Sequence, residues 1–223
     1  MHGKERPSAG HWRPDSSVER TLWSAGYSQL AGIDEVGRGA WAGPVVAAAV
    51  ILPTGDDYAL ASLSGVRDSK ALSPRQREVL LPVITQVCAA MAIGLASSSF
   101  IDHWGIVAAT RRAMHMAVAR LGVSPDYLLI DALALPALAQ PQTAIVHGDA
   151  SVLSIASASI VAKVFRDRLM STLDAYWPGY DFARNKGYGV ARHRMALNQM
   201  GPCPAHRWSF APLRQISEET RCP

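Results

Sequence analysis

Four acidic residues stand at or just after the ends of apolar segments, and carboxylates in this pattern could bind metal ions. They are Asp34, Glu35, Asp131 and Asp149. Sites in open α/β sheets form at the carboxyl ends of strands, so we expect the four side chains to converge. Like-charged neighbours oppose one another's ionisation, and hard divalent cations such as Mg²⁺ and Mn²⁺, which prefer oxygen ligands, relieve that repulsion. Two such ions can activate a water and stabilise the leaving oxygen of a phosphodiester.

Each acid also has an ordinary structural explanation. An isolated Asp-Glu pair more often caps a turn, and Asp131 or Asp149, taken singly, is more often a helix cap or a turn former. Asp149 could serve both purposes, because it precedes a predicted helix whose N-terminal dipole stabilises negative charge. What favours a site is the tripeptide that follows the first two acids.

That tripeptide is Gly-Arg-Gly at residues 37–39, called here the 37–39 loop. Glycine permits a positive φ or a close backbone approach, and the arginine can meet a phosphate while neighbouring amide N–H groups stay accessible. Exposed amides can approach a sugar closely, and the 2′-hydroxyl is the group by which a protein distinguishes RNA from DNA. Consecutive strand residues point to opposite faces, so we expect the strand's pleat to break into this turn if Asp34 and Glu35 are to reach one site.

The charge distribution is compatible with a polyanionic partner. The chain has a formal net charge of +4 and a pI of about 9.1. Between residues 163 and 214 there are nine Lys or Arg and three Asp, so that stretch carries +6 and the rest of the chain −2. Acids at one site and bases in the C-terminal third suit a metal-dependent enzyme acting on nucleic acid. A basic face that is merely solvated is the alternative.

Cysteine and histidine usage argues against other kinds of site. The three cysteines, Cys88, Cys203 and Cys222, are far apart and form no C-x-x-C pair, which indicates a reduced compartment. The seven histidines form no H-x-x-x-H pair and no cluster with cysteine, which argues against zinc. No apolar run approaches membrane-spanning length, and the N-terminus lacks a signal-peptide pattern. We therefore expect a cytoplasmic protein, monomeric and without a membrane partner.

After an opening hairpin at residues 30–52, strand and helix patterns alternate, which predicts a mixed β-sheet with helices packed on it. The remaining predicted strands are 90–97, 127–130 and 143–146, the last two covered on both faces. The predicted helices are 17–25, 74–87, a stretch from Ser99 or Asp102 to about 122 that breaks at Gly105, 152–176 and 190–200. We expect one domain at residues 17–213, a disordered arm at 1–16 and a tail at 214–223.

Single residues give local signals. Ser17 is expected to cap the first helix, with Glu19 favouring its first turn, and Ser73 with Pro74 is expected to start the second. Small residues at 154–159 predict a close approach of the long helix to the sheet.

The sequence resembles the ribonuclease HII family, the bacterial type 2 ribonucleases H. Its motifs follow the family's order between about residue 18 and residue 213: Asp34-Glu35-Val36-Gly37-Arg38-Gly39, Ala42-Gly43-Pro44-Val45-Val46, Asp68-Ser69-Lys70, Leu129-Ile130-Asp131, Gly148-Asp149, the run 154–164, Lys186-Gly187-Tyr188-Gly189 and His206-Arg207-Trp208-Ser209-Phe210. Several motifs in one order are far more specific than any one of them. The resemblance implies an α/β fold, a ribonuclease H-like mixed β-sheet flanked by α-helices, with a helical C-terminal extension.

The resemblance also implies a reaction and a set of site residues. The reaction is hydrolysis of the RNA strand of RNA–DNA hybrids and cleavage 5′ of single ribonucleotides in duplex DNA, leaving a 3′-hydroxyl and a 5′-phosphate. The four acids would be the catalytic ligands of Mn²⁺ or Mg²⁺. The implied substrate-binding residues are Gly37, Arg38 and Gly39 at the 2′-hydroxyl, Lys70 at a phosphate and Tyr188 on the following deoxyribose. His147 stands where the family commonly has lysine, and we expect a surface histidine at a strand end.

Two other functions are weighed against this one. A DNA-acting nuclease or strand-transfer enzyme of the same fold superfamily is disfavoured by the Gly-Arg-Gly and Gly-Tyr-Gly elements. A catalytically inactive nucleic-acid binder is disfavoured by the presence of all four acids.

Overall fold

The computed structural model describes residues 13–214 of the 223-residue chain. The expected arm at 1–16 and tail at 214–223 lie mostly outside the described residues. Asp15, which belongs to the expected arm, forms a parallel bridge with Val152. Among residues 13–214, no helix has both the length and the apolar character needed to cross a bilayer.

A five-stranded mixed sheet forms the centre of the molecule, in the order β3-β2-β1-β4-β5. Strands β1, β2 and β3 are antiparallel, whereas β4 and β5 run parallel to β1. Their bounds are Leu30–Val36 (β1), Val45–Ile51 (β2), Ala90–Ala96 (β3), Tyr127–Asp131 (β4) and Gln142–Ile145 (β5). The opening hairpin and the mixed sheet are confirmed. The expectation that the fifth strand is covered on both faces is wrong, because β5 is an edge strand whose Thr143 and Ala144 are exposed.

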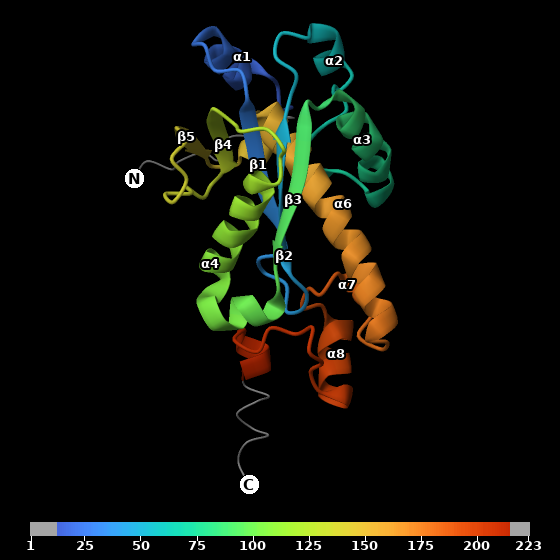
Figure 1. The fold of residues 1–223 in the computed structure, drawn as a ribbon. Helices are drawn as coiled ribbons and strands as arrows, with labels where there is room; N and C mark the ends of the chain where they lie inside the picture. The colour runs from blue at the N-terminus through green and yellow to red at the C-terminus, as the bar shows by residue number, and fades with distance from the viewer. Residues whose placement is uncertain (1–12, 215–223) are drawn as a thin grey trace, which may run out of the picture.

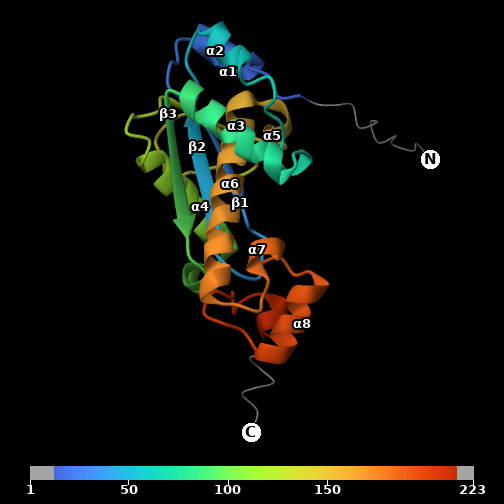
Figure 2. The ribbon, with the colours of Figure 1, turned by 90° about the vertical axis from the view of Figure 1, so that its right-hand side faces the viewer.

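Helices cover both faces of the sheet. The segments are α1 (Ser17–Ser24), α2 (Asp57–Ala61), η1 (Ser69–Ala71), α3 (Pro74–Val87), α4 (Ser98–Ala119), α5 (Gly148–Ser151), α6 (Leu153–Tyr176), α7 (Phe182–Asn185) and α8 (Ala191–Met200). Figures 1 and 2 show α4 on one face of the sheet and α3 with α6 on the other. Alternate β2 residues are buried against each layer, with Ala47 on the side of α4 and Ala48 on the side of α6.

Local chemistry explains where two of these helices start and bend. Ser73 accepts a hydrogen bond from the amide of Gln76, whose side chain bonds back to Ser73. This capping box, with Pro74 at the first helical position, starts α3 where predicted. Gly105 in α4 has φ 78° and ψ 163°, which confirms the predicted break.

Helix α6 lies directly against β1. A Cβ added at Gly32 would stand 2.3 Å from the Ser154 carbonyl carbon, so only glycine allows this approach. Glu19 is fully buried and accepts a hydrogen bond from the Ser154 amide at 2.8 Å, which caps α6. The predicted close approach is confirmed, but Ser17 is not the cap of α1. The N-cap is Ser16, and the Ser17 amide donates to Asp15.

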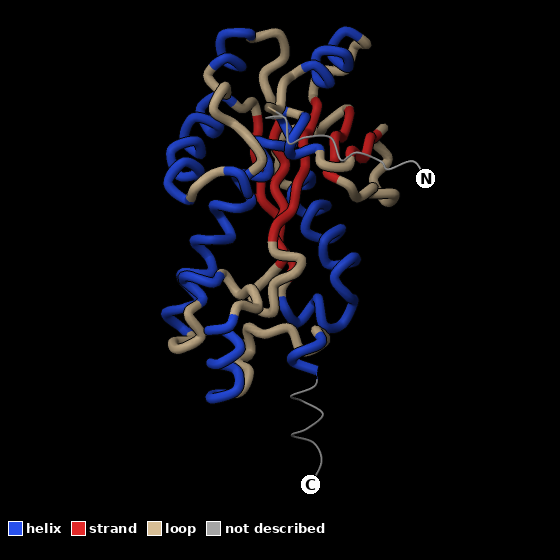
Figure 3. The backbone as a smooth tube through the Cα atoms, turned by 180° about the vertical axis from the view of Figure 1, so that it is seen from behind, coloured by secondary structure: helices blue, strands red, loops and turns tan. Residues whose placement is uncertain are grey.

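A third apolar cluster forms at the end of the sheet where β1 leads into β2. Phe182 of α7, Leu197 of α8 and Met170 of α6 are buried in it, together with Leu213 near the end of the described chain. Figures 2 and 3 show α7, α8 and their connecting loops gathered below this end of the strands. The C-terminal segments therefore form a helical extension beside the β1–β2 loop.

Candidate metal and substrate site

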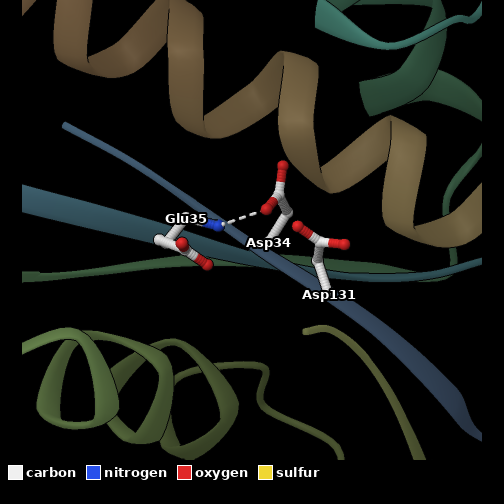
Figure 4. Close-up of side chains that lie close together, drawn as sticks. All are labelled: Asp34, Glu35 and Asp131. Carbon is white, nitrogen blue, oxygen red and sulfur yellow. Dashed lines mark hydrogen bonds between the residues drawn. The ribbon is translucent and has the colours of Figure 1, made fainter. Parts of the chain in front are cut away.

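Three carboxylates converge where β1 and β4 stop pairing. Asp34, Glu35 and Asp131 each offer an oxygen, and these oxygens lie within 4.8 Å of one another. In Figure 4 the carboxylates of Asp34 and Asp131 lie side by side toward α6, and Glu35 points away from that helix.

The expected break in the pleat of β1 is wrong. Its pairing with β2 continues to Val36↔Val46, beyond both acids. The pairing of β1 with β4 instead ends at Ile33↔Ile130, one residue before the aspartates. The carboxylates therefore have room because β1 and β4 are no longer paired at this point, and not because β1 turns.

The electrostatics of the three acids favour a bound cation. Burial raises the pKa of Asp34 well above its ordinary value, and the charges of Glu35 and Asp131 raise it further. Burial also raises the pKa of Glu35 and of Asp131. Glu35 Oε2 is buried and has no hydrogen-bond partner among the described residues. A divalent cation would supply both the missing charge and the missing partner, so these residues fit a hard metal ion.

Asp149 lies beside this group but outside it. It is 4% exposed in α5, and its Oδ2 accepts a hydrogen bond from Lys70 Nζ at 3.1 Å. The neighbouring Gly148 amide donates to Asp131 Oδ1 at 2.9 Å, and the Asp149 charge contributes to the raised pKa of Asp131. Three of the four predicted acids are therefore within mutual reach, and the fourth is paired with the predicted phosphate-binding lysine. His147 is exposed at the start of α5, in the left-handed region with φ 58°.

The two glycines of the 37–39 loop have different environments. Gly37 has φ +91°, and a Cβ there would lie 2.1 Å from Arg166 Nε. At Gly39 no atom lies within 4 Å of an added Cβ, so its outer side is open. Arg38 lies between them, and its Nη1 is 3.3 Å from Glu35 Oε1. This ion pair joins the loop to the acids.

Two fully buried arginines hold the connection between β1 and β2, which includes the 37–39 loop, and the sequence reasoning missed both. Arg166 of α6 donates to the carbonyls of Ala42, Pro44 and Lys186 at 2.9–3.1 Å. Arg207 donates to the carbonyls of Gly37, Arg38 and Gly43 at 2.7–2.9 Å. Both were counted in the basic C-terminal third, yet each has 0% exposure. The available signals were the positions of Arg166 in a largely apolar helix and Arg207 within the His-Arg-Trp-Ser-Phe motif.

Tyr188 is brought next to the loop after β1. The carbonyl of Gly187 accepts hydrogen bonds from the amides of Trp41 and Ala42 at 2.8 and 3.3 Å. A Cβ at Gly189 would lie 2.1 Å from the Trp41 ring, so the glycine permits close contact. The ring of the half-buried Tyr188 lies 5.5 Å from the guanidinium of Arg166.

A chain of hydrogen bonds ends on the Tyr188 carbonyl. The Cys203 amide donates to His206 Nδ1 at 3.0 Å, the two Nε2 atoms of His206 and His193 are 3.0 Å apart, and His193 Nδ1 is 3.0 Å from the Tyr188 oxygen. The Cys203 carbonyl oxygen lies farther from His206 Nδ1, at 3.2 Å. We therefore take the shorter amide contact as the hydrogen bond. A backbone N–H can only donate, which assigns the hydrogen of His206 to Nε2 and that of His193 to Nδ1. Burial, followed by the neighbouring His193, lowers the pKa of His206 to about 4. Burial also lowers the pKa of His193, so both rings are neutral at neutral pH.

Comparison with known proteins identifies relatives that match most of the chain. The family model described as Ribonuclease HII matches residues 31–213. The ribonuclease HII of Roseiflexus castenholzii is 52% identical over 200 residues, which cover 90% of this chain and 89% of the relative. The ribonuclease HII of Geobacillus thermodenitrificans is 48% identical over 212 residues, which cover 95% and 80% of the two chains.

Solved structures show the same arrangement of elements. The ribonuclease H2 of Pyrococcus horikoshii is 25% identical, with a TM-score of 0.72 over 87% of this chain and 100% of that one. The ribonuclease HII of Archaeoglobus fulgidus, solved in complex with PCNA, is 25% identical, with a TM-score of 0.69 over 82% and 95% of the two chains. The ribonuclease H-like mixed sheet with flanking helices and a helical C-terminal part is confirmed.

Proposed function

The chain belongs to the ribonuclease HII family, endoribonucleases of RNA–DNA hybrids, and we propose that it also cleaves duplex DNA 5′ of single embedded ribonucleotides. The observation that carries this proposal is the position of the three converging carboxylates directly beside the 37–39 loop. A metal site next to exposed backbone amides brings the hydrolysing groups and a reader of the sugar within reach of one nucleotide.

We propose that Asp34, Glu35, Asp131 and Asp149 hold two divalent cations, Mg²⁺ or Mn²⁺. The raised pKa values of the first three acids and the unpartnered Glu35 oxygen support a cation at their centre. A donor set of carboxylate oxygens alone favours these hard ions over zinc. Such ions, when bound, promote attack by water and stabilise the departing oxygen of the phosphodiester. Asp149 would exchange its contact with Lys70 for a contact with metal.

The remaining roles belong to residues around the acids. The 37–39 loop contacts the 2′-hydroxyl through its amides, and the ring of Tyr188 packs on the deoxyribose that follows. Lys70, whose side chain is 78% exposed, and Arg38 contact phosphates. Held in this way, the phosphodiester 5′ of the ribonucleotide lies over the acids, and hydrolysis leaves a 3′-hydroxyl and a 5′-phosphate. We propose that the enzyme is monomeric, since the roles assigned here call for no residue of a second copy.

The test is cleavage of an end-labelled DNA duplex that contains one ribonucleotide, in Mg²⁺ and in Mn²⁺. We expect a single cut 5′ of the ribonucleotide and no cut in the matched all-DNA duplex. Cleavage of the all-DNA duplex would indicate a DNA-acting nuclease instead. Binding without any cleavage in either ion would indicate an inactive nucleic-acid binder.

A further inference from the structure

The guanidinium of Arg207 is bound entirely by backbone carbonyls. Its Nη2 donates to Gly37 at 2.7 Å, its Nη1 to Arg38 at 2.8 Å and its Nε to Gly43 at 2.9 Å. The ring of Phe210 lies 5.1 Å from the guanidinium carbon, which helps to fix the plane of the group. No carboxylate in residues 13–214 forms an ion pair with Arg207.

These contacts determine where the amides of the 37–39 loop point. No peptide bond in residues 13–214 is cis, and in a planar trans peptide the C=O and N–H groups point in opposite directions. The carbonyls of Gly37 and Arg38 point inward to Arg207, so the amides of Arg38 and Gly39 point outward. Neither amide donates a hydrogen bond to another described residue. The open space beside Gly39 leaves this pair of donors accessible.

We propose that Arg207 is a positioning residue for ribose recognition, because it orients two adjacent amides toward the sugar oxygen that distinguishes RNA from DNA. The inference rests on the proposed function of the 37–39 loop. A 2′-hydroxyl offers an acceptor to such donors, and a deoxyribose offers none at that position.

A lysine could not perform this task equally well. The planar guanidinium presents several donors in a fixed fork, whereas an ammonium is a point charge on a flexible stem. Lysine in place of Arg207 would keep the charge but not hold the two successive peptide planes together. A purely structural role for Arg207 predicts lost stability alone, whereas a positioning role predicts lost discrimination between ribose and deoxyribose.

The experiment compares two duplexes that differ by one 2′-hydroxyl. Dissociation constants are measured for a ribonucleotide-containing duplex and the matched all-DNA duplex, in Ca²⁺, with a gel check that no cleavage occurs. For Arg207→Lys we expect the ratio of the two constants to fall about tenfold, the factor for about 1.4 kcal/mol. Affinity for the all-DNA duplex should change by less than about twofold, because the phosphate contacts are retained.

The matched control is Arg77→Lys. Arg77 is also a buried arginine that holds two backbone carbonyls, those of Ser69 and Leu72, but it does not touch the 37–39 loop. Thermal melting of both variants gives the loss of stability. The control should lose stability and keep its discrimination within about twofold of wild type, because the phosphates it could affect are common to both duplexes.

Three outcomes separate the possibilities. If wild type does not discriminate between the duplexes, the proposed role of the 37–39 loop fails. If wild type discriminates between the duplexes and Arg207→Lys discriminates equally, the role of Arg207 is overturned. It is also overturned if Arg77→Lys loses as much discrimination as Arg207→Lys. If Arg207→Lys does not fold, Phe210→Leu removes the ring beside the guanidinium and is expected to lower the ratio about threefold. An unchanged ratio in that variant would also overturn the inference.

Discussion

At the scale of single residues, protons and a cation compete for the same oxygens of Asp34, Glu35 and Asp131. Their folded-state pKa values lie above the ordinary values of 3.8 and 4.5. The stabilisation from the protonated forms is therefore complete below those ordinary values and is lost as the pH rises through the raised ones. We expect the metal-free protein to lose stability as the pH rises from about 4.5, the ordinary value of Glu35, toward neutral, and we expect added Mn²⁺ to restore more of that stability at the higher pH.

Thermal melting across this range, with chelator and then with Mn²⁺, measures the effect. Asp131→Asn is the control, because it removes one titrating group together with its repulsion of Asp34 and Glu35. Its metal-free melting temperature should depend less on pH than that of wild type. A wild-type protein whose metal-free melting temperature depends on pH no more than that of Asp131→Asn would contradict the repulsion described here, because any effect of other groups is common to both proteins.

The same variant tests catalysis. Asp131→Asn removes one negative charge from the group of three while keeping the shape of the side chain, so we expect it to fold with wild-type stability or better near neutral pH. Cleavage at saturating metal should fall by about 10²-fold or more, in the range for losing one electrostatic contact to a transition state. Wild-type cleavage by this variant would remove Asp131 from the site.

The two glycines of the 37–39 loop allow a paired test. Gly37→Ala places a side chain at φ +91° and 2.1 Å from Arg166, and should destabilise the protein by about 2 kcal/mol or more. Gly39→Ala meets no atom within 4 Å and has no positive φ, so its stability should change by less than about 0.5 kcal/mol. Its cleavage of a ribonucleotide-containing duplex should nevertheless fall about tenfold or more, because a methyl group occupies the sugar's approach.

Denaturant unfolding and kcat/KM on one substrate distinguish these effects. Gly39→Ala with full activity would show that the sugar does not approach this glycine. Gly55→Ala, also at a positive φ but with no neighbour within 4 Å, separates backbone strain from the clash at Gly37.

Residue types predicted the acids better than they predicted the arginines. A carboxylate after an apolar run carries its own signal, and Asp34 and Asp131 do lie close together, each one residue beyond the last β1–β4 pair. Arginine is almost always exposed, so burial of Arg166 and Arg207 contradicts the ordinary expectation. Their partners are backbone carbonyls, which leave no complementary charge in the sequence to reveal them.

At the scale of elements, long segments with clear ends were predictable and single-turn helices were not. Ser73 and Pro74 correctly predicted the start of α3, and Gly105 correctly predicted the break in α4. The short α5 and α7 were missed, since four residues are too few to display a helical period. The predicted long helix begins at Leu153 rather than Val152, after α5 has already placed Asp149.

The hydrogen-bond chain from Cys203 to Tyr188 gives the C-terminal elements a pH dependence. The folded-state pKa of His206 is lowered from 6.5 to about 4, so its contribution to stability is complete above 6.5 and is lost as the pH falls toward 4. A proton added to His206 would go to Nδ1, where it would face the Cys203 amide N–H that donates to that atom. We expect hydrogen exchange at Tyr188 and in α8 to increase over this range before the sheet is affected.

His206→Asn is the informative variant, because an amide cannot gain a charge. It should lose about 1–3 kcal/mol at neutral pH, through the unpaired ring of His193. Acidification should then loosen α8 less than in wild type. Equal acid sensitivity in the two proteins would assign the effect to other groups.

At the scale of the whole molecule, the basic excess of the C-terminal third divides into buried and exposed parts. Arg166 and Arg207 are internal, whereas Arg192 and Arg194 of α8 are exposed. Only the exposed charges can release counterions from a duplex. We expect Arg192→Ala with Arg194→Ala to weaken duplex binding and to reduce the slope of log K against log salt by up to about two units.

Fluorescence anisotropy at several salt concentrations measures this slope. Arg111→Ala on α4 is the control, since Arg111 is exposed but belongs to the helix on the other face of the sheet from α6. A double variant with the wild-type slope would show that α8 does not face the duplex.

The anchoring of residues 37–39 by Arg207 has a consequence for protein synthesis. Chains fold from the N-terminus as they leave the ribosome. The strand that carries Asp34 and Glu35 is made early, but the guanidinium that orients the neighbouring amides is made 170 residues after Gly37. A nascent or prematurely terminated chain that lacks this segment therefore contains its acids without the means to select ribose, and selectivity is acquired only once residue 207 has been made.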